Sequence, residues 1–160
     1  NRDEVTQVVA FAQQRGFLPV VGAYHWDVGL YGKQDATLMY KREQARMVFE
    51  RLLEERALPP GYLRQYAKDN VTWLAGEQLK PCDAGGYSIA IDASGNLSPC
   101  LSLLPVGSLR ESSLSEIVAR FDRSRIQRCS DHSSCNRLDG RVIGSVLRHP
   151  IAAWQTPVSW

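Results

Sequence analysis

The sequence predicts an α/β region followed by a small α+β unit that consists of a β-hairpin and a helix. In the first half, apolar residues recur at helical spacing around one short apolar run of strand length, Phe17 to Tyr24. Further on, YSIAID and LSPCLS have the composition of two strands joined by Ala93-Ser94-Gly95-Asn96, in which glycine and asparagine tolerate the positive φ of a tight turn. All four cysteines lie in this second part.

The first element is a helix that begins at Asn1 or Asp3 and ends at Gly16, with one apolar face made of Val5, Val8, Val9 and Ala12. The run from Phe17 to Tyr24 is apolar throughout, which is typical of a strand buried on both faces of a parallel sheet. The residues after it, His25 to Gly32, form a loop at the carboxyl end of that strand. Parallel sheets place their ligands at this edge.

Two more helices are predicted, from about Thr37 to Ala57 and over 61–75, and a domain boundary follows near residue 78. Domain 1–78 is therefore expected to be α/β and domain 79–160 to be α+β. In the second domain, Ser113-x-x-Glu116 has the pattern of a capping box at the start of a helix. A weak helix is expected near 141–148, followed by a tail.

Composition and charge argue against some classes of partner. The net charge of +2 over 160 residues gives no argument for nucleic acid or for a membrane surface as partner. No apolar run approaches the ~18 residues of a membrane span. The compartment follows from the cysteines instead: if they bind a metal or a cluster and form no disulfides, the compartment is reducing, and we expect a cytoplasmic protein.

The cysteines follow the pattern Cys82-x17-Cys100-x28-Cys129-x5-Cys135, and four thiolates suffice to close one metal or iron–sulfur site. Two disulfides or buried thiols are alternatives, but the predicted hairpin brings Cys82 and Cys100 together at its open end. Structural zinc sites use cysteine pairs with two to four intervening residues, and neither pair here has that spacing. His132 could replace one thiolate, although a loop imidazole is the commoner role.

Residues 80–137 resemble a known family. The pattern of Cys82, a hairpin, Gly95 and then Pro99-Cys100, followed by Val106-Gly107-Ser108-Leu109 and a short helix from Leu114, is similar to the auxiliary-cluster extension of radical S-adenosylmethionine (SAM) enzymes. The shorter form of that extension is called a twitch domain and the longer form a SPASM domain. Full SPASM domains carry Cys-x2-Cys-x5-Cys-x3-Cys. Here only the middle two positions are cysteines, because Ile126 and Asp139 occupy the outer ones.

The resemblance implies one auxiliary [4Fe-4S] cluster held by Cys82, Cys100, Cys129 and Cys135. It also implies that 1–78 is the end of a partial (β/α)6 barrel, with Tyr24 and His25 near the adenine of SAM. The family's Cys-x3-Cys-x2-Cys motif, which binds a second [4Fe-4S] cluster and SAM, does not occur in the chain. We therefore expect the C-terminal portion of a larger enzyme, inactive alone, with the N-terminal radical SAM half as its partner.

In such an enzyme the auxiliary cluster transfers electrons while a radical modifies or oxidises the substrate. The expected partners are a peptide or small-molecule substrate and an electron donor protein, and no nucleic acid or membrane. The alternative from another class is a non-catalytic interaction module stabilised by a four-cysteine zinc site.

Overall fold

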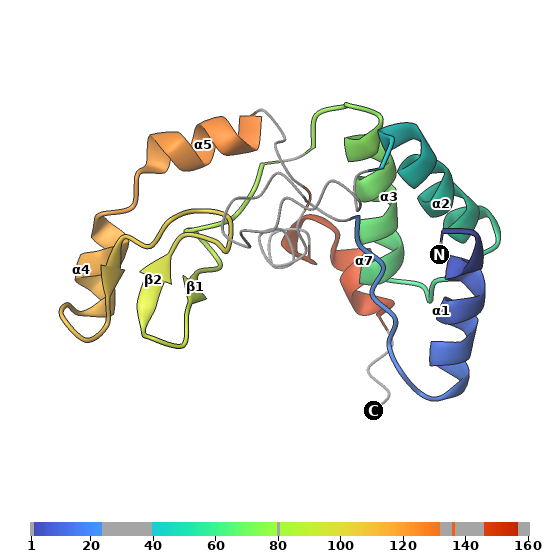
Figure 1. Ribbon diagram of the computed structural model, residues 1–160, viewed down its shortest axis with the longest axis horizontal. Helices are drawn as coiled ribbons and strands as arrows, with labels where there is room; N and C mark the ends of the chain where they lie inside the picture. Colours follow the sequence, from blue (N-terminus) through green and yellow to red (C-terminus); the bar gives the residue numbers. More distant parts are fainter. Residues whose placement is uncertain (1, 24–39, 80, 132–135, 137–145, 157–160) are drawn as a thin grey trace.

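The computed structural model describes residues 2–23, 40–79, 81–131, 136 and 146–156. Figure 1 shows two groups of elements at opposite ends of the long axis. A helical group at one end contains the first three α-helices and the last one. A small sheet with two helices lies at the other end. This is a mixed architecture in which the sheet is antiparallel, as expected for a small α+β domain.

The helical group is built from η1 (Arg2–Glu4), α1 (Val5–Gln14), α2 (Arg42–Glu54) and α3 (Tyr62–Leu74), so all three helices predicted for this part of the chain are confirmed. Their apolar faces meet in one core, because each helix has apolar residues three and four positions apart. The fully buried members of this core are Val9, Phe49, Leu52, Leu58, Ala67, Trp73, Leu74 and Leu79. Val8, which we expected on the buried face of α1, is 59% exposed.

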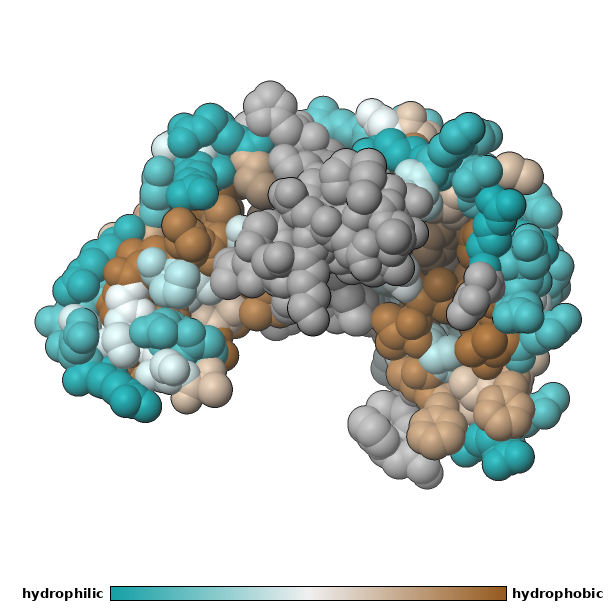
Figure 2. Space-filling model, viewed as in Figure 1, coloured by the Kyte–Doolittle hydropathy of each residue, from teal (hydrophilic) through white to brown (hydrophobic). Residues whose placement is uncertain are grey.

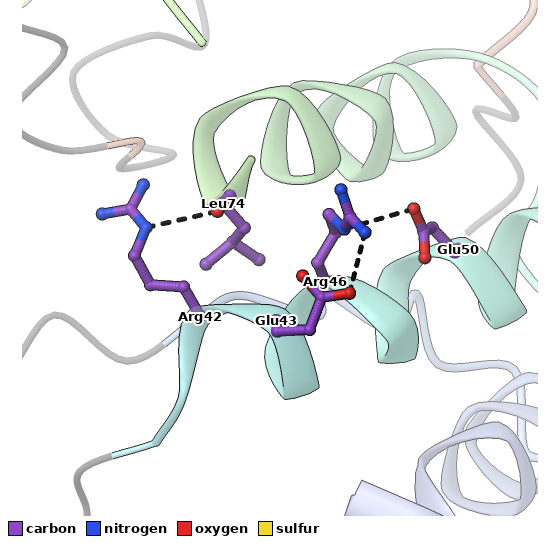
Figure 3. Close-up of polar contacts among 5 residues, drawn as sticks. All are labelled: Arg42, Glu43, Arg46, Glu50 and Leu74. Carbon is purple, nitrogen blue, oxygen red and sulfur yellow. Dashed lines mark hydrogen bonds and ion pairs between the residues drawn. The ribbon is translucent and has the colours of Figure 1, made fainter. Parts of the chain in front are cut away.

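Arg42 ties the beginning of α2 to the end of α3. Its Nε donates to the carbonyl of Leu74 at 3.2 Å, a second guanidinium nitrogen donates to the carbonyl of Trp73, and the guanidinium lies 4.8 Å from the Trp73 ring centroid (Figure 3). The last carbonyls of a helix have no partner within the helix, so a cation is well placed there. Arg46, one turn on, pairs with Glu43 and Glu50 of its own helix and with no other residue in the described ranges.

The expected buried strand over Phe17–Tyr24 is wrong for the part that the structure describes, because residues 17–23 form no strand. A parallel strand exists only beside a neighbour that completes its hydrogen bonds, and the described residues contain no parallel sheet. Exposure nevertheless alternates along the segment. Val21 and Ala23 pack against the helical core and Pro19 is half-buried, while Leu18 and Val20 are 55% and 52% exposed.

The predicted hairpin is confirmed, with shorter strands than expected. Strand β1 (Ala90–Ile91) pairs with β2 (Asn96–Ser98), and β2 pairs with β3 (Gly107–Ser108), all antiparallel and in the order β1-β2-β3. The turn is closed by Asp92, whose carboxylate accepts hydrogen bonds from the backbone N–H of Ser94 and Asn96. Gly95 has a φ of 83°, which is the positive value that the sequence predicted.

Two helices cover this sheet. Helix α4 (Leu114–Ala119) begins at the predicted capping box, in which Ser113 and Glu116 bond each other's backbone N–H. Helix α5 (Arg123–Asp131) follows, and it was not predicted as a helix. The second core lies between sheet and helices and consists of Leu97, Ile117, Phe121 and Ile126. Gly107 is where the backbone of β3 meets Ile117, because a Cβ there would lie 3.0 Å from that side chain.

Helix α7 (Pro150–Trp154), in the region that we expected to be a tail, returns to the helical group. The backbone of Gly61, at the start of α3, touches Thr156, whose hydroxyl accepts a hydrogen bond from the Tyr62 N–H at 2.9 Å. Among the helices in the described ranges, none combines the length and the apolar character that a membrane crossing requires.

Candidate metal centre

Cys82 lies directly before a tight loop. The Asp83 carbonyl accepts hydrogen bonds from the N–H groups of Gly86 and Tyr87, both at 3.0 Å, and the Gly85 N–H donates to Ser88 at 2.7 Å. Gly85 has a φ of 70°, which favours glycine. The half-buried Cys82 therefore enters a fixed turn rather than an open loop.

Cys100 follows β2 and is held by its own backbone. Its carbonyl accepts hydrogen bonds from the Ser98 hydroxyl at 2.9 Å and from the Leu103 N–H at 3.2 Å. The backbone N–H of Ser102 donates to the Cys100 Sγ at 3.3 Å. An N–H bond to sulfur stabilises negative charge there, and such bonds are one means by which proteins tune metal-bound thiolates.

Cys129 lies on α5, one turn after Ile126, and is half-buried. Residues three apart on a helix share a face, so Cys129 lies on the side of α5 that Ile126 turns toward the sheet.

The three segments that carry these cysteines meet at Gly85. A Cβ at Gly85 would lie 3.0 Å from Ile126 Cδ1, 3.1 Å from Phe121 Cδ2 and 3.2 Å from Pro99 Cβ. Pro99 precedes Cys100, Ile126 precedes Cys129 by one turn, and Gly85 follows Cys82. Arg123 reinforces the contact by donating to the Gly85 carbonyl at 2.5 Å. The close approach thus depends on the absence of a side chain at Gly85.

The fourth cysteine is known only through its neighbour. Cys135, like His132, Tyr24 and His25, lies outside the described residues. Asn136 is fully buried, and neither polar atom of its side chain has a hydrogen-bond partner among the residues that the structure describes. Its backbone carbonyl accepts a hydrogen bond from the Tyr66 hydroxyl at 2.9 Å. A buried amide without a partner is costly, and a sulfur acceptor from a cluster would satisfy its N–H groups but not its carbonyl oxygen.

These observations fit a thiolate-held cluster, although the described ranges alone contain no group of three His, Cys, Asp or Glu side chains arranged around one point. Thiolate is the donor that iron–sulfur clusters take. Ligands of this kind are drawn together when the group binds, because metal binding is coupled to folding.

One ion pair beside the cysteines had no signal in the sequence. Arg148 contacts Asp83 through both guanidinium Nη atoms, at 3.0 and 2.6 Å, across 65 positions of the chain. Sequence patterns report neighbours along a helix or strand, and they carry no information on a contact of this separation.

An apolar cavity lies at the other end of the molecule. It has a volume of about 300 Å³ and opens between α1, α2 and the segment that ends at Ala23, directly before Tyr24. Its lining is mostly apolar, including Val5, Val21 and Phe49.

The donor set is of the kind that iron–sulfur clusters take. Residues 82–139 match the family model of an iron–sulfur cluster-binding domain, the SPASM domain. The match begins at Cys82 and includes all four cysteines. No curated protein and no solved structure matches the chain.

Proposed function

We propose that the chain is the C-terminal portion of a radical SAM enzyme, in which the SPASM-type domain holds one auxiliary [4Fe-4S] cluster. The observation that carries this proposal is the meeting of three cysteine-bearing segments at Gly85, inside a stretch that matches an iron–sulfur family. Cys82, Cys100, Cys129 and Cys135 would supply the four thiolates. When bound, a fully ligated cluster of this type supplies one-electron transfer.

The chain's own residues have three roles in this proposal. The cysteines hold the group, the Ser102 N–H donates to one of the sulfurs, and Gly85 lets the segments approach. The domain would serve the radical modification or oxidation of a peptide or small molecule in the cytoplasm, with an electron donor protein as partner.

The missing partner would be the N-terminal half that binds SAM. Exposed apolar side chains on α1 and on the segment after it support a further body packed there, and Figure 2 shows hydrophobic atoms at the surface of the helical group. Val8, Phe11 and Phe17 are 59%, 57% and 69% exposed.

Anaerobic reconstitution with iron and sulfide tests the proposal directly. We expect four iron and four sulfide ions per chain, a brown colour and broad visible absorbance, as for any [4Fe-4S] protein. A colourless protein with one tightly bound zinc ion would contradict the proposal and establish the zinc-stabilised interaction module. Two disulfides in the purified protein would contradict both.

A further inference from the structure

The Arg148–Asp83 ion pair is partly removed from water. The Arg148 side chain is 28% exposed and that of Asp83 is 10% exposed. Both carboxylate oxygens accept from the guanidinium, in the two-pronged geometry that gives arginine–carboxylate pairs their directionality. Partial burial and this geometry distinguish the pair from the exposed ion pairs of α2, because exposed ion pairs contribute little to the free energy of unfolding.

Arg148 also faces more than one negative group. Its pKa is raised, first by the hydrogen bond with Asp83 and further by the negative charges of Asp83 and Asp69, and burial opposes this shift only in part. Cys82 is the residue directly before Asp83. Arg148 therefore contacts the turn that begins next to the first cysteine.

The Arg148 guanidinium is held in position by contacts between its flanking residues and the helical group. Val146, two residues before Arg148, packs on Tyr62, Leu63 and Tyr66 of α3. Helix α7 begins two residues after Arg148 and is anchored on the start of α3 through Thr156. Arg148 is thus held by the helical group and reaches across to Asp83, the residue that follows the first cysteine.

We propose that Arg148 is a positioning residue of the cluster site, which fixes Cys82 through Asp83 and raises the reduction potential of the cluster with its positive charge. The inference rests on the proposed cluster site. Reduction adds one electron, and hence one negative charge, to the bound group. A nearby cation favours the reduced state and a nearby anion opposes it, most strongly where water is partly excluded. Arg148 should therefore raise the reduction potential of the cluster, and Asp83 should lower it.

The test is the reduction potential of the reconstituted full chain, measured by dithionite titration with redox dyes and followed by visible absorbance and electron paramagnetic resonance. We expect Arg148→Gln to disfavour the reduced cluster about tenfold, which is about 59 mV more negative for one electron. Asp83→Asn should shift the potential to more positive values. Arg148→Lys retains the charge and should stay near the wild-type potential.

Arg110→Gln is the matched control, because this exposed arginine lies beside Gly95 at the turn of the hairpin, at the end away from Cys82 and Cys100. It removes the same charge and should leave the potential unchanged. If Arg148→Gln does not fold, the opposite shift of Asp83→Asn and the unchanged potential of Arg148→Lys still carry the test.

Potentials that do not move, or that move in the same direction in Arg148→Gln and Asp83→Asn at full iron content, would show that the pair is only a structural contact. That result would leave the proposed function intact. Failure of the wild-type chain to take up iron and sulfide would instead overturn the proposed function, and this inference with it.

Discussion

Gly85 is the residue on which the candidate site depends most. Alanine there would combine a strained positive φ with contacts of 3.0 to 3.2 Å to three neighbouring side chains. Overpacking alone costs about 1–3 kcal/mol in a well-packed core. We therefore expect Gly85→Ala to lower the free energy of unfolding by at least that amount and to reduce the iron content after reconstitution. Urea unfolding and iron analysis on the same sample measure both.

The neighbouring Gly86 provides the control. A Cβ at Gly86 would meet only the Asp83 carbonyl at 3.4 Å, which is an ordinary contact, and the residue is exposed. Gly86→Ala should keep near wild-type stability and iron content. Equal behaviour of the two variants would show that the segments do not need to approach at Gly85.

Cys100 should be essential for a stable cluster, whereas its loss should spare the SAM chemistry assigned to the other half. Replacement by alanine removes one of four thiolates, together with the sulfur that the Ser102 N–H bonds. We expect Cys100→Ala to lose most of the auxiliary iron. In the complete enzyme it should still cleave SAM slowly but form little product. Full auxiliary iron with normal product formation would remove Cys100 from the ligand set.

At the scale of single residues, the sequence predicted local turns better than tertiary contacts. The cysteine spacing and the Gly95 turn indicated a hairpin with Cys82 and Cys100 at its open end, and the hairpin and turn are confirmed. The roles of Gly85, Asn136 and Arg148 could not be predicted. Each depends on residues brought close by tertiary packing, for which a single sequence holds no pattern.

At the scale of elements, the junction of α2 and α3 offers two arginines one turn apart with different roles. Arg42 donates to the final carbonyls of α3, whereas Arg46 pairs with two glutamates of its own helix (Figure 3). A hydrogen bond from a charged donor contributes about 1.5–3 kcal/mol. We expect Arg42→Gln to cost about that much in urea unfolding. Arg46→Gln should cost about 0.5 kcal/mol or less, as for exposed pairs. Equal losses would contradict the capping role of Arg42.

Acid should weaken the sheet and its two helices through three carboxylates. The pKa of Asp92 is lowered mainly by the Asn96 side chain, that of Glu116 by the Ser113 backbone N–H, and that of Asp122 by the Ser124 hydroxyl. A lowered pKa means that the unfolded chain binds protons first. The stabilisation is therefore full above the ordinary values of 3.8 and 4.5 and is lost as pH falls through the lower folded values.

Unfolding by urea at a series of pH values checks this expectation. Asp92→Asn retains the turn geometry but cannot bind a proton, so its stability should depend less steeply on pH in the acid range. An unchanged slope would mean that the Asp92 turn does not contribute to the acid sensitivity.

The elements were predictable where local chemistry decides them. The capping box placed the start of α4, and apolar periodicity placed α1, α2 and α3. The arginine-rich sequence of α5 has a weak apolar face, and β3 is two residues long, so neither carries a clear local signal. Both form because Ile126 and the backbone of Gly107 complete a core around Ile117 and Leu97.

For the whole molecule, we expect no SAM cleavage by this chain alone. Cleavage requires an iron with an open position, and the sequence holds no Cys-x3-Cys-x2-Cys motif to provide one. The reconstituted protein, incubated with SAM and dithionite, should form no 5′-deoxyadenosine above a protein-free control. Formation of 5′-deoxyadenosine that disappears in Cys100→Ala would assign SAM binding to the cluster in this chain.

The overall architecture was predictable only in part. The order of a helical region and a hairpin-containing unit follows from the sequence, but the strand expected at Phe17–Tyr24 required hydrogen-bonding neighbours that the described residues do not contain. An apolar run indicates that a segment is buried, but it does not indicate which element or which chain packs against it.

The alternating segment at residues 18–23 also has a consequence for handling the protein. Leu18 and Val20 expose apolar side chains next to the exposed Phe17. Clusters of exposed apolar side chains favour contacts between copies of a protein, first in loose oligomers and then in a precipitate. The isolated chain should therefore associate and precipitate more readily as its concentration rises. Charged residues at positions 18 and 20 should remedy it without touching the cysteines.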